Sequence, residues 1–145
     1  MVEFYSPTGW AGSKYKEVRK KGLSTVDVAK LIRQDIKKKY PKLKTSVRTQ
    51  YFSMGSSIDV YIKDAPFNPI NPNWNPKDWS SLAYQNPRYT KKGEQLLENI
   101  KKIGQKYQLH DVDSMTDYFN VSFYFDVKYD YDAENKWIKE RGIRI

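Results

Sequence analysis

Cysteine is absent from this chain of 145 residues, and histidine occurs only once. Without thiols there is no disulfide framework, no thiolate nucleophile and no cysteine metal site, a composition typical of a reducing compartment. We therefore expect the protein to act in the cytoplasm. A single histidine also leaves a nucleophilic triad and a transition-metal shell without the residues that they require.

Long apolar runs and glycine-rich loops are missing as well. No apolar stretch approaches the roughly 20 residues that a bilayer-spanning helix needs, and residues 1–10 lack the pattern of a secretory signal. The seven glycines are scattered along the chain and form no phosphate-binding loop. We therefore expect no contact with a membrane, no nucleotide hydrolysis and no cofactor.

What the chain does contain is typical of one folded domain. Hydrophobic residues make up 39% of it, which is enough apolar surface to offset the loss of conformational entropy although 30% of the residues are charged. A length of 145 residues fits one core and is too short for two comfortable ones. We predict a single domain over residues 1–145.

The charge of the chain is large and unevenly distributed. The formal net charge is +9; residues 14–48 hold thirteen basic side chains against three acidic ones, and residues 111–134 hold seven acidic side chains against one basic one. Such a separation attracts polyanions to one side of a molecule and repels them from the other. The alternative interpretation is a uniformly solvated surface.

Two stretches carry the signals of amphipathic helices. Ser24 is the expected cap of the first helix, with Asp27 as its reciprocal partner, and Pro41 ends it. Thr90 is the expected cap of the second, whose apolar stripe is opposed by a lysine-rich face. The segment after Asp132 is interpreted either as a short helix that docks on the core or as a final strand.

Three further stretches alternate apolar and polar residues. Residues 45–52 and 58–63 flank the turn sequence "SMGSS", which predicts a hairpin whose loop is longer than two residues and exposes Met54. Residues 118–129 alternate without interruption and predict one long strand. The predicted fold is α+β: a small antiparallel sheet of three to four strands with two main helices packed on one face and a long Pro/Asn-rich loop.

The segments of the predicted domain differ in character. Residues 1–22 are expected to be a loosely ordered arm, residues 23–63 a helix and a hairpin, and residues 90–145 a helix, a long strand and a C-terminal segment. Residues 64–89 hold five prolines, five asparagines and two tryptophans, and prolines remove backbone donors, so this segment must be a loop. An exposed indole ring adds no stability to the fold, so we expect the loop's large side chains to pack on the rest of the protein and hold the loop against it. These are Phe67, Ile70, Trp74, Trp79 and Tyr84.

The loop is interpreted either as a roof over the core or as a lid that binds a partner. We expect the two tryptophans to divide these roles, so that one stabilises the fold and the other contacts a partner.

One acidic cluster invites a catalytic interpretation. His110, Asp111, Asp113 and Asp117 lie close together and could form a metal site or acid–base pair, as in a metal-dependent nuclease. Their spacing fits no known ligand loop, and acid-rich joints are usually solvated turns. We therefore expect no metal and no enzymatic activity, and we interpret Asp117 as a cap or turn residue.

The basic stretch is the strongest physical signal. Lysines and arginines interleaved with tyrosines combine phosphate contact with stacking surface, as in proteins that bind nucleic acid. A basic helix that only keeps the protein soluble is the alternative. The candidate residues for partner or nucleic-acid binding are Lys14, Lys16, Arg19, Lys20, Lys21, Arg33, Lys37, Lys38, Arg48, Trp74 and Trp79.

Three stretches resemble a known family. They are "VAKLIRQDIKKKYP", "TSVRTQYFSMGSSIDVYIKD" and "TDYFNVSFYFDVKYD", and they resemble the large polyvalent protein-associated domain twenty-nine, a module of large phage and plasmid proteins and their stand-alone relatives. The resemblance leaves out residues 1–22 and the segment after Asp132. It implies a gene on a mobile element, among proteins that protect incoming DNA from host defences, and it supplies no catalytic residue.

Charge and resemblance together predict a counter-defence protein that binds and inhibits a host nucleoprotein defence complex, as an anti-CRISPR protein does. The expected partner is a host defence protein or ribonucleoprotein complex, or nucleic acid directly, in contact with residues 14–48 and with the proline-rich loop. The alternative is a nucleic-acid-binding accessory domain of a phage or plasmid that has no protein target.

Overall fold

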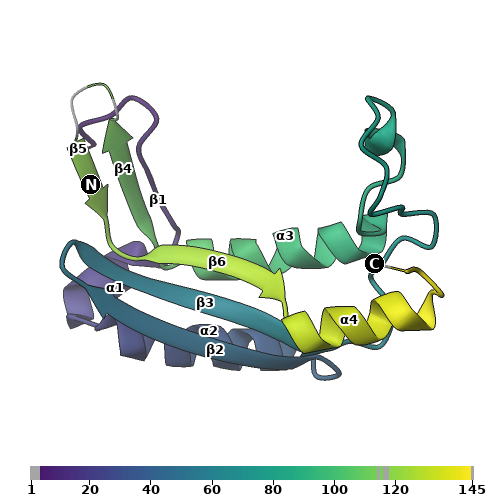
Figure 1. The fold of residues 1–145 in the computed structure, drawn as a ribbon. Helices are drawn as coiled ribbons and strands as arrows, with labels where there is room; N and C mark the ends of the chain where they lie inside the picture. Colours follow the sequence, from purple (N-terminus) through teal and green to yellow (C-terminus); the bar gives the residue numbers. More distant parts are fainter. Residues whose placement is uncertain (1–3, 114, 116–117, 145) are drawn as a thin grey trace.

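Helices and strands in this protein combine into an α+β fold, which confirms the predicted class. The computed structural model describes residues 4–113, 115 and 118–144, and within them it places four α-helices and two three-stranded sheets (Figure 1). In chain order the elements are β1 (Trp10–Ala11), α1 (Tyr15–Lys21), α2 (Thr25–Lys39), β2 (Lys44–Phe52), β3 (Gly55–Asp64), a 3₁₀ turn (Ala83–Gln85), α3 (Lys91–Gln105), β4 (Leu109–Asp113), β5 (Tyr118–Val121), β6 (Tyr124–Tyr129) and α4 (Tyr131–Glu140).

The two sheets differ in strand direction. The larger sheet has the order β2-β3-β6, in which β2 pairs antiparallel and β6 pairs parallel with the central strand β3. The smaller sheet has the order β1-β4-β5 and is antiparallel throughout. The structure thus differs from the prediction of a single antiparallel sheet. A parallel pair of strands requires a long crossover connection, and the chain between β3 and β6 provides one.

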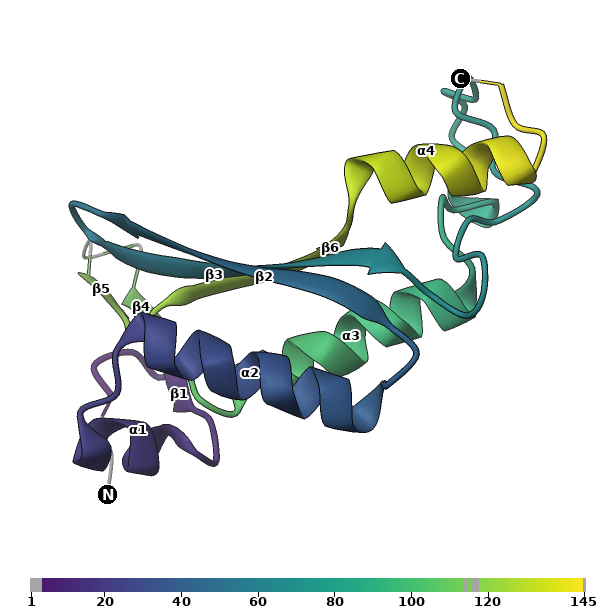
Figure 2. The same cartoon turned by 90° about the horizontal axis from the view of Figure 1, so that it is seen from below.

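The core lies between the larger sheet and two helices. Ile58, Val60 and Ile62 of β3 have no exposed surface, and α2 and α3 cover this face of the sheet (Figure 2). The predicted capping box of α2 is confirmed, since the Ser24 side chain accepts a hydrogen bond from the Asp27 N–H and the Asp27 carboxylate accepts one from the Ser24 N–H. Both main helices lie on the same face of the larger sheet, as predicted.

A glycine sets the distance between α3 and the sheet. A Cβ atom at Gly104 would lie 2.3 Å from the ring of Phe125 in β6. Any larger residue at this position would push the helix away from the strand.

The cap of α3 is the predicted one, because the Thr90 hydroxyl accepts a hydrogen bond from the Gly93 N–H at 3.0 Å.

The β2–β3 hairpin is tighter than predicted. Phe52 pairs with Gly55, so only Ser53 and Met54 form the turn, and Met54 is 83% exposed at its tip. Gly55 adopts a φ of 152°, a conformation that other residues rarely adopt. This glycine allows pairing to begin directly after a two-residue turn, which explains the shorter loop.

The predicted long strand over residues 118–129 is broken into two strands that belong to different sheets. The break falls at Ser122 and Phe123. The Ser122 hydroxyl accepts a hydrogen bond from the Leu109 N–H at 2.9 Å, and the Gln108 amide donates to the Phe123 carbonyl at 2.6 Å. These bonds satisfy backbone groups where the chain leaves one sheet for the other, so the change of sheet costs no unpaired polar group.

The N-terminal segment has more structure than a loosely ordered arm. Its strand β1 pairs with β4, and Val18 of α1 is buried in the core. Asp111, expected in a solvated turn, instead lies in β4 and is 2% exposed. Its carboxylate accepts hydrogen bonds from the N–H groups of Tyr5 at 2.6 Å and Ser6 at 2.7 Å, and so it holds the arm in place.

The Pro/Asn-rich loop builds its own turns. It contains four Asn-Pro pairs, and in the three that begin at Asn68, Asn71 and Asn75 the asparagine side chain accepts a 3.0 Å hydrogen bond from the N–H of the residue after the proline. Proline has no N–H, so the next residue supplies the nearest available donor. This repeated turn explains why asparagine and proline occur together here.

The helix α4 fastens the loop to the body. Of the two alternatives for this segment, the structure has the helix, with Trp137 and Ile138 buried. Glu134, which is 8% exposed, accepts a hydrogen bond from Arg88 Nε at 2.6 Å and another from the Tyr89 hydroxyl. A buried carboxylate with two donors ties the end of the loop to the helix.

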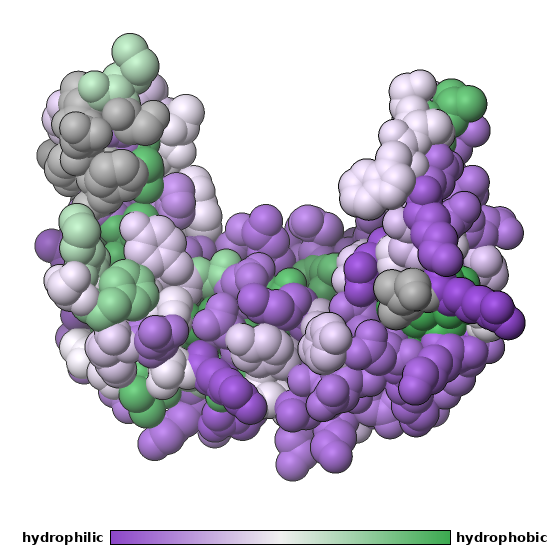
Figure 3. Space-filling model, in the orientation of Figure 1, coloured by the Kyte–Doolittle hydropathy of each residue, from purple (hydrophilic) through white to green (hydrophobic). Residues whose placement is uncertain are grey.

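Two projections rise from the body at opposite ends. One consists of β4 and β5 with β1 beside them, and the other is the loop between β3 and α3 (Figure 1). Figure 3 shows both projections on either side of a wide concavity.

We expect Asp111→Ala to lower the free energy of unfolding by about 2–4 kcal/mol, because the buried N–H of Ser6 and the part-buried N–H of Tyr5 lose this acceptor. Urea unfolding measures this change, and limited proteolysis should locate new cleavage in residues 4–12. The matched control is Asp113→Ala, since among the described residues the Asp113 carboxylate accepts a local bond from the Met115 N–H at 3.1 Å and none from the N-terminal arm. Equal effects of the two substitutions would contradict the assigned role of Asp111.

Buried phenols predict a loss of stability in alkali. Burial is the main cause that raises the pKa of Tyr89, Tyr107 and Tyr129 well above the ordinary value, and nearby carboxylates raise it further. The phenols of these tyrosines ionise from about pH 10 in the unfolded chain, whereas they stay neutral in the folded chain. Their contribution to the free energy of unfolding is therefore complete below pH 10 and declines above it. Tyr89→Phe should make the decline of unfolding free energy with pH shallower. Tyr84→Phe, which removes a hydroxyl from a side chain that is 74% exposed, is the matched control.

Candidate nucleic-acid interface

The two main helices lie side by side and run in opposite directions. Near the end of α2, the Asp35 carboxylate lies 3.8 Å from Lys106 Nζ and accepts a hydrogen bond from the Tyr107 hydroxyl. Further along, Lys39 of α2 and Asn99 of α3 line the same cavity. Since both helices turn their apolar stripes toward the sheet, both turn polar faces to the same outer side.

A groove runs between these polar faces. It consists of two adjoining cavities of about 510 and 630 Å³ that share Lys39 and Asn99. Lysines stand on both of its walls, and we call it the lysine groove. Its lysines are Lys38, Lys39, Lys42, Lys92, Lys102 and Lys106.

The charge of the lysine groove is almost uncompensated. Asp35 is the one acidic side chain among the described residues that line it, and this carboxylate is already engaged by Lys106 and Tyr107. In the described part of the chain, Lys106 is also the one groove lysine that takes part in an ion pair. Concentrated like charge of this kind favours binding of an anion or polyanion.

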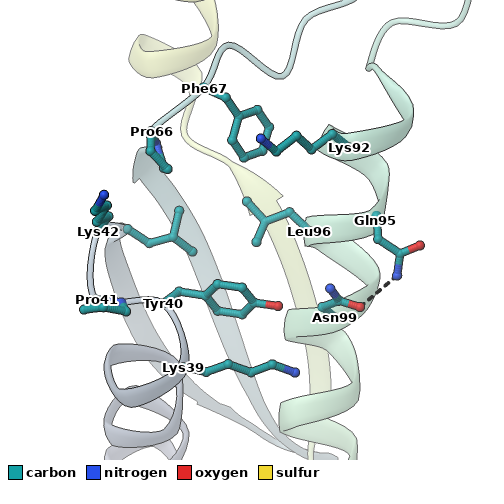
Figure 4. Close-up of a pocket in the computed structure, with 11 residues that line it drawn as sticks. Lys39, Tyr40, Pro41, Lys42, Pro66, Phe67, Lys92, Gln95, Leu96 and Asn99 are labelled. Carbon is teal, nitrogen blue, oxygen red and sulfur yellow. Dashed lines mark hydrogen bonds between the residues drawn. The ribbon is translucent and has the colours of Figure 1, made fainter.

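One end of the groove is apolar. There Tyr40, Leu43, Phe67 and Leu96 form the walls of the 510 Å³ cavity, and Lys39, Lys42 and Lys92 lie at its rim (Figure 4). We call this end the apolar pocket. Lys92 Nζ lies 4.5 Å from the centre of the Phe67 ring.

The structure separates the basic residues predicted from the sequence. Lys38 lines the groove, and Lys37 is exposed in the same last turn of α2. Arg33 donates a 3.0 Å hydrogen bond to the Val47 carbonyl, so its side chain fastens α2 to β2. The other predicted basic residues lie at two further places.

Arg48 lies on the opposite side of the sheet. It stands 5.5 Å above the Tyr61 ring, on the face that the helices do not cover. The remaining predicted cations lie in and just before α1: Lys14, Lys16, Arg19, Lys20 and Lys21. The Lys14 N–H donates to the Lys106 carbonyl at 2.7 Å, so the start of α1 adjoins one end of the lysine groove.

Most lysines of the groove were not among the binding residues predicted from the sequence. The basic candidates ended at Arg48, and Lys92, Lys102 and Lys106 lie far beyond it. The available signal was the lysine-rich face of the second helix. That signal gains meaning only when α2 and α3 are known to be neighbours.

The two tryptophans of the loop have different surroundings. Trp74 is half-buried under Arg88, whose guanidinium lies 4.7 Å from the ring, whereas Trp79 is 92% exposed. Ile70 is fully buried and Phe67 is half-buried, as expected for residues that pin the loop. The expectation is wrong for Trp79 and Tyr84, because the Asn-Pro turns hold this part of the loop away from the core.

The acidic cluster does not form a metal site in the described residues. His110 stacks on Trp10 with ring centres 5.6 Å apart, and Asp111 is committed to the N-terminal arm. The described part of the chain contains no group of three His, Cys, Asp or Glu side chains that could hold a metal ion. Asp117 lies outside the described residues. None of the described helices is long and apolar enough to span a bilayer.

The comparisons with known proteins agree with the resemblance. A family model for the large polyvalent protein associated domain 29 matches residues 23–133, which include both helices of the lysine groove. The chain belongs to this family. Large polyvalent protein associated domain 29 is a domain of large polyvalent proteins from mobile elements. Comparison with curated proteins and with solved structures gave no match.

We expect Trp74→Ala to lower the free energy of unfolding by about 2–3 kcal/mol, because it removes a packed ring and the closer of the two cation–π contacts of Arg88. Trp79→Ala should change it by less than about 0.5 kcal/mol, as substitutions of exposed residues usually do. Thermal and urea unfolding of the two variants measure the difference. Equal losses would mean that the loop only covers the core.

Proposed function

We propose that this protein is a non-catalytic counter-defence protein of a mobile element. It binds a host nucleoprotein defence complex inside the bacterial cell and inhibits it, as an anti-CRISPR protein does. The observation that carries this proposal is the lysine groove, which we assign to the nucleic-acid component of the complex. Membership of the mobile-element family supports the biological setting.

The chemistry of the groove suits a phosphate backbone. Its six lysines come from both helices and from the segments that directly follow them. Lysine acts on phosphate as a flexible point charge, and such contacts position a strand without reading its sequence. The release of counterions from the nucleic acid would supply much of the binding free energy.

The acidic residues support a basic exterior. Asp111 and Glu134 are buried acceptors, and Asp130 caps α4 by accepting a hydrogen bond from the Ala133 N–H at 3.3 Å. Asp126 pairs with Lys128 at 3.3 Å. Four of the seven acidic side chains in residues 111–134 are thus buried, paired with a lysine or engaged in a helix cap, which argues against an acidic inhibitor that imitates DNA.

A second candidate function is that of an accessory nucleic-acid-binding domain with no protein target. The same groove would serve it, so only a functional assay separates the two. We would express the protein in bacteria that carry several defence systems and measure how well a targeted plasmid survives. Protection that depends on the groove supports inhibition of a defence complex, and nucleic-acid binding without any protection supports the accessory domain.

Binding to a generic duplex and to a single strand tests the groove directly. Micromolar affinity is expected at low salt, falling steeply as salt rises. Lys38→Glu with Lys102→Glu should weaken binding by at least about tenfold and reduce the slope of log K against log salt by about 2. Fluorescence anisotropy with labelled oligonucleotides measures both quantities.

The matched control is Arg48→Glu with Lys136→Glu, which makes the same change of charge away from the groove. This variant should keep nearly the affinity and the slope of the natural chain. Absence of binding at low salt, or an equal loss in both variants, would contradict the assignment. Intact oligonucleotides after incubation with Mg²⁺ are expected, and their degradation would contradict the non-catalytic role.

A further inference from the structure

The apolar pocket differs in chemistry from the rest of the lysine groove. Phe67 and Leu43 are half-buried in its walls, Leu96 is 6% exposed at its back, and the side chains converge on an open space of about 510 Å³ (Figure 4). This volume lies within the range of ligand-binding pockets. Water in such a space finds few hydrogen-bond partners, so an apolar group that displaces it is stabilised.

The rim of the pocket carries cations that lack carboxylate partners. In the described part of the chain, Lys39, Lys42 and Lys92 take part in no ion pair, and no acidic side chain lines the pocket. Instead the Lys92 amine rests over Phe67 at 4.5 Å and the Lys39 amine lies 5.6 Å from the Tyr40 ring. Each amine keeps donors free for an anion, and the rings remain on its other side.

We propose that the apolar pocket is a docking site for an acidic segment of a partner protein. One or two large apolar side chains of that segment enter the pocket, and flanking carboxylates meet the three rim lysines. The inference rests on the proposed function because it takes the acidic segment to belong to the protein component of the host nucleoprotein complex. The nucleic-acid component would then bind the rest of the lysine groove.

A nucleobase suits the pocket less well than an apolar side chain. The edges of a base carry donors and acceptors that must be paired when they are buried. The two amides near the rim, Gln95 and Asn99, bond to each other at 2.8 Å, and the remaining walls are mainly hydrocarbon. Leucine or tryptophan side chains have little or nothing to leave unpaired. Charge complementarity at the rim then selects acidic neighbours.

Three labelled hexapeptides test this assignment by fluorescence anisotropy. The first is Asp-Glu-Trp-Leu-Glu-Asp, the second replaces Trp-Leu with Ser-Ser, and the third replaces the four acids with lysine. The first should bind at least about tenfold more tightly than either of the others, since it alone has both the apolar and the anionic parts.

Gln95→Trp is the diagnostic variant. Gln95 is exposed and lines the pocket, so an indole there would narrow the pocket without replacing a core residue. Peptide binding should fall at least about tenfold while the unfolding temperature and oligonucleotide binding stay unchanged. Lys42→Glu with Lys92→Glu should also weaken the acidic peptide. Lys101→Glu with Lys136→Glu, a charge-matched control away from the pocket, should not.

The outcomes separate this inference from the proposed function. Equal binding of the three peptides, no binding of the first up to about 1 mM, or normal binding by Gln95→Trp would overturn the docking site and leave the nucleic-acid groove standing. Loss of oligonucleotide binding in Gln95→Trp would assign the pocket to a base and overturn the inference. Peptide binding that persists when no oligonucleotide binds would overturn the proposed function alone.

Discussion

The buried row of Ile58, Val60 and Ile62 in β3 is the constraint on which the rest of the structure depends. Each of these side chains is fully buried, and burial of one such side chain stabilises a fold by about 1.5–3 kcal/mol. Since β3 is the central strand, β2 and β6 occupy its two edges and only a face remains for the helices. The helices α2 and α3 cover that face together, so their polar sides meet in the lysine groove.

Parallel pairing of β6 with β3 explains the two projections. A chain that must re-enter a sheet in the same direction needs a long crossover, and here the crossover runs over residues 65–123. It contains the Pro/Asn-rich loop before α3 and the pair β4–β5 after it. Both extend away from the core, whereas α3, which lies between them in the crossover, packs on the sheet (Figure 1). The Glu134 bonds to Arg88 and Tyr89 then hold the base of the loop.

Local signals in the sequence predicted the parts of the fold that depend on neighbouring residues. The capping box of Ser24 with Asp27, the Thr90 cap and the β2–β3 pairing are all determined within a few positions of the chain. The break at Ser122 follows from contacts with Gln108 and Leu109 on another segment, and the alternating pattern continues across it. Periodicity cannot reveal such a break.

The same distinction applies to the site. The lysines of the groove were visible in the sequence as two basic faces, but their meeting depends on which helices are neighbours. The burial of Asp111 depends on backbone donors more than a hundred positions away. The distribution of charge along the chain placed Lys38 in a basic stretch. It could not show that Lys38 lies in the same groove as Lys102 and Lys106.

Helix electrostatics show which of the groove's lysines the fold itself favours. Lys38 and Lys39 lie in the last turn of α2, where the partial negative charge of the helix end stabilises cations. Lys91 and Lys92 are the first two residues of α3, where the partial positive charge disfavours a cation by about 0.3–1 kcal/mol. Helix stability thus gives no reason for Lys92, and packing of its amine over Phe67 is a contact of about the same size as this cost. An anion at the pocket rim would add a favourable interaction, because it would place negative charge beside both the lysine and the positive end of α3.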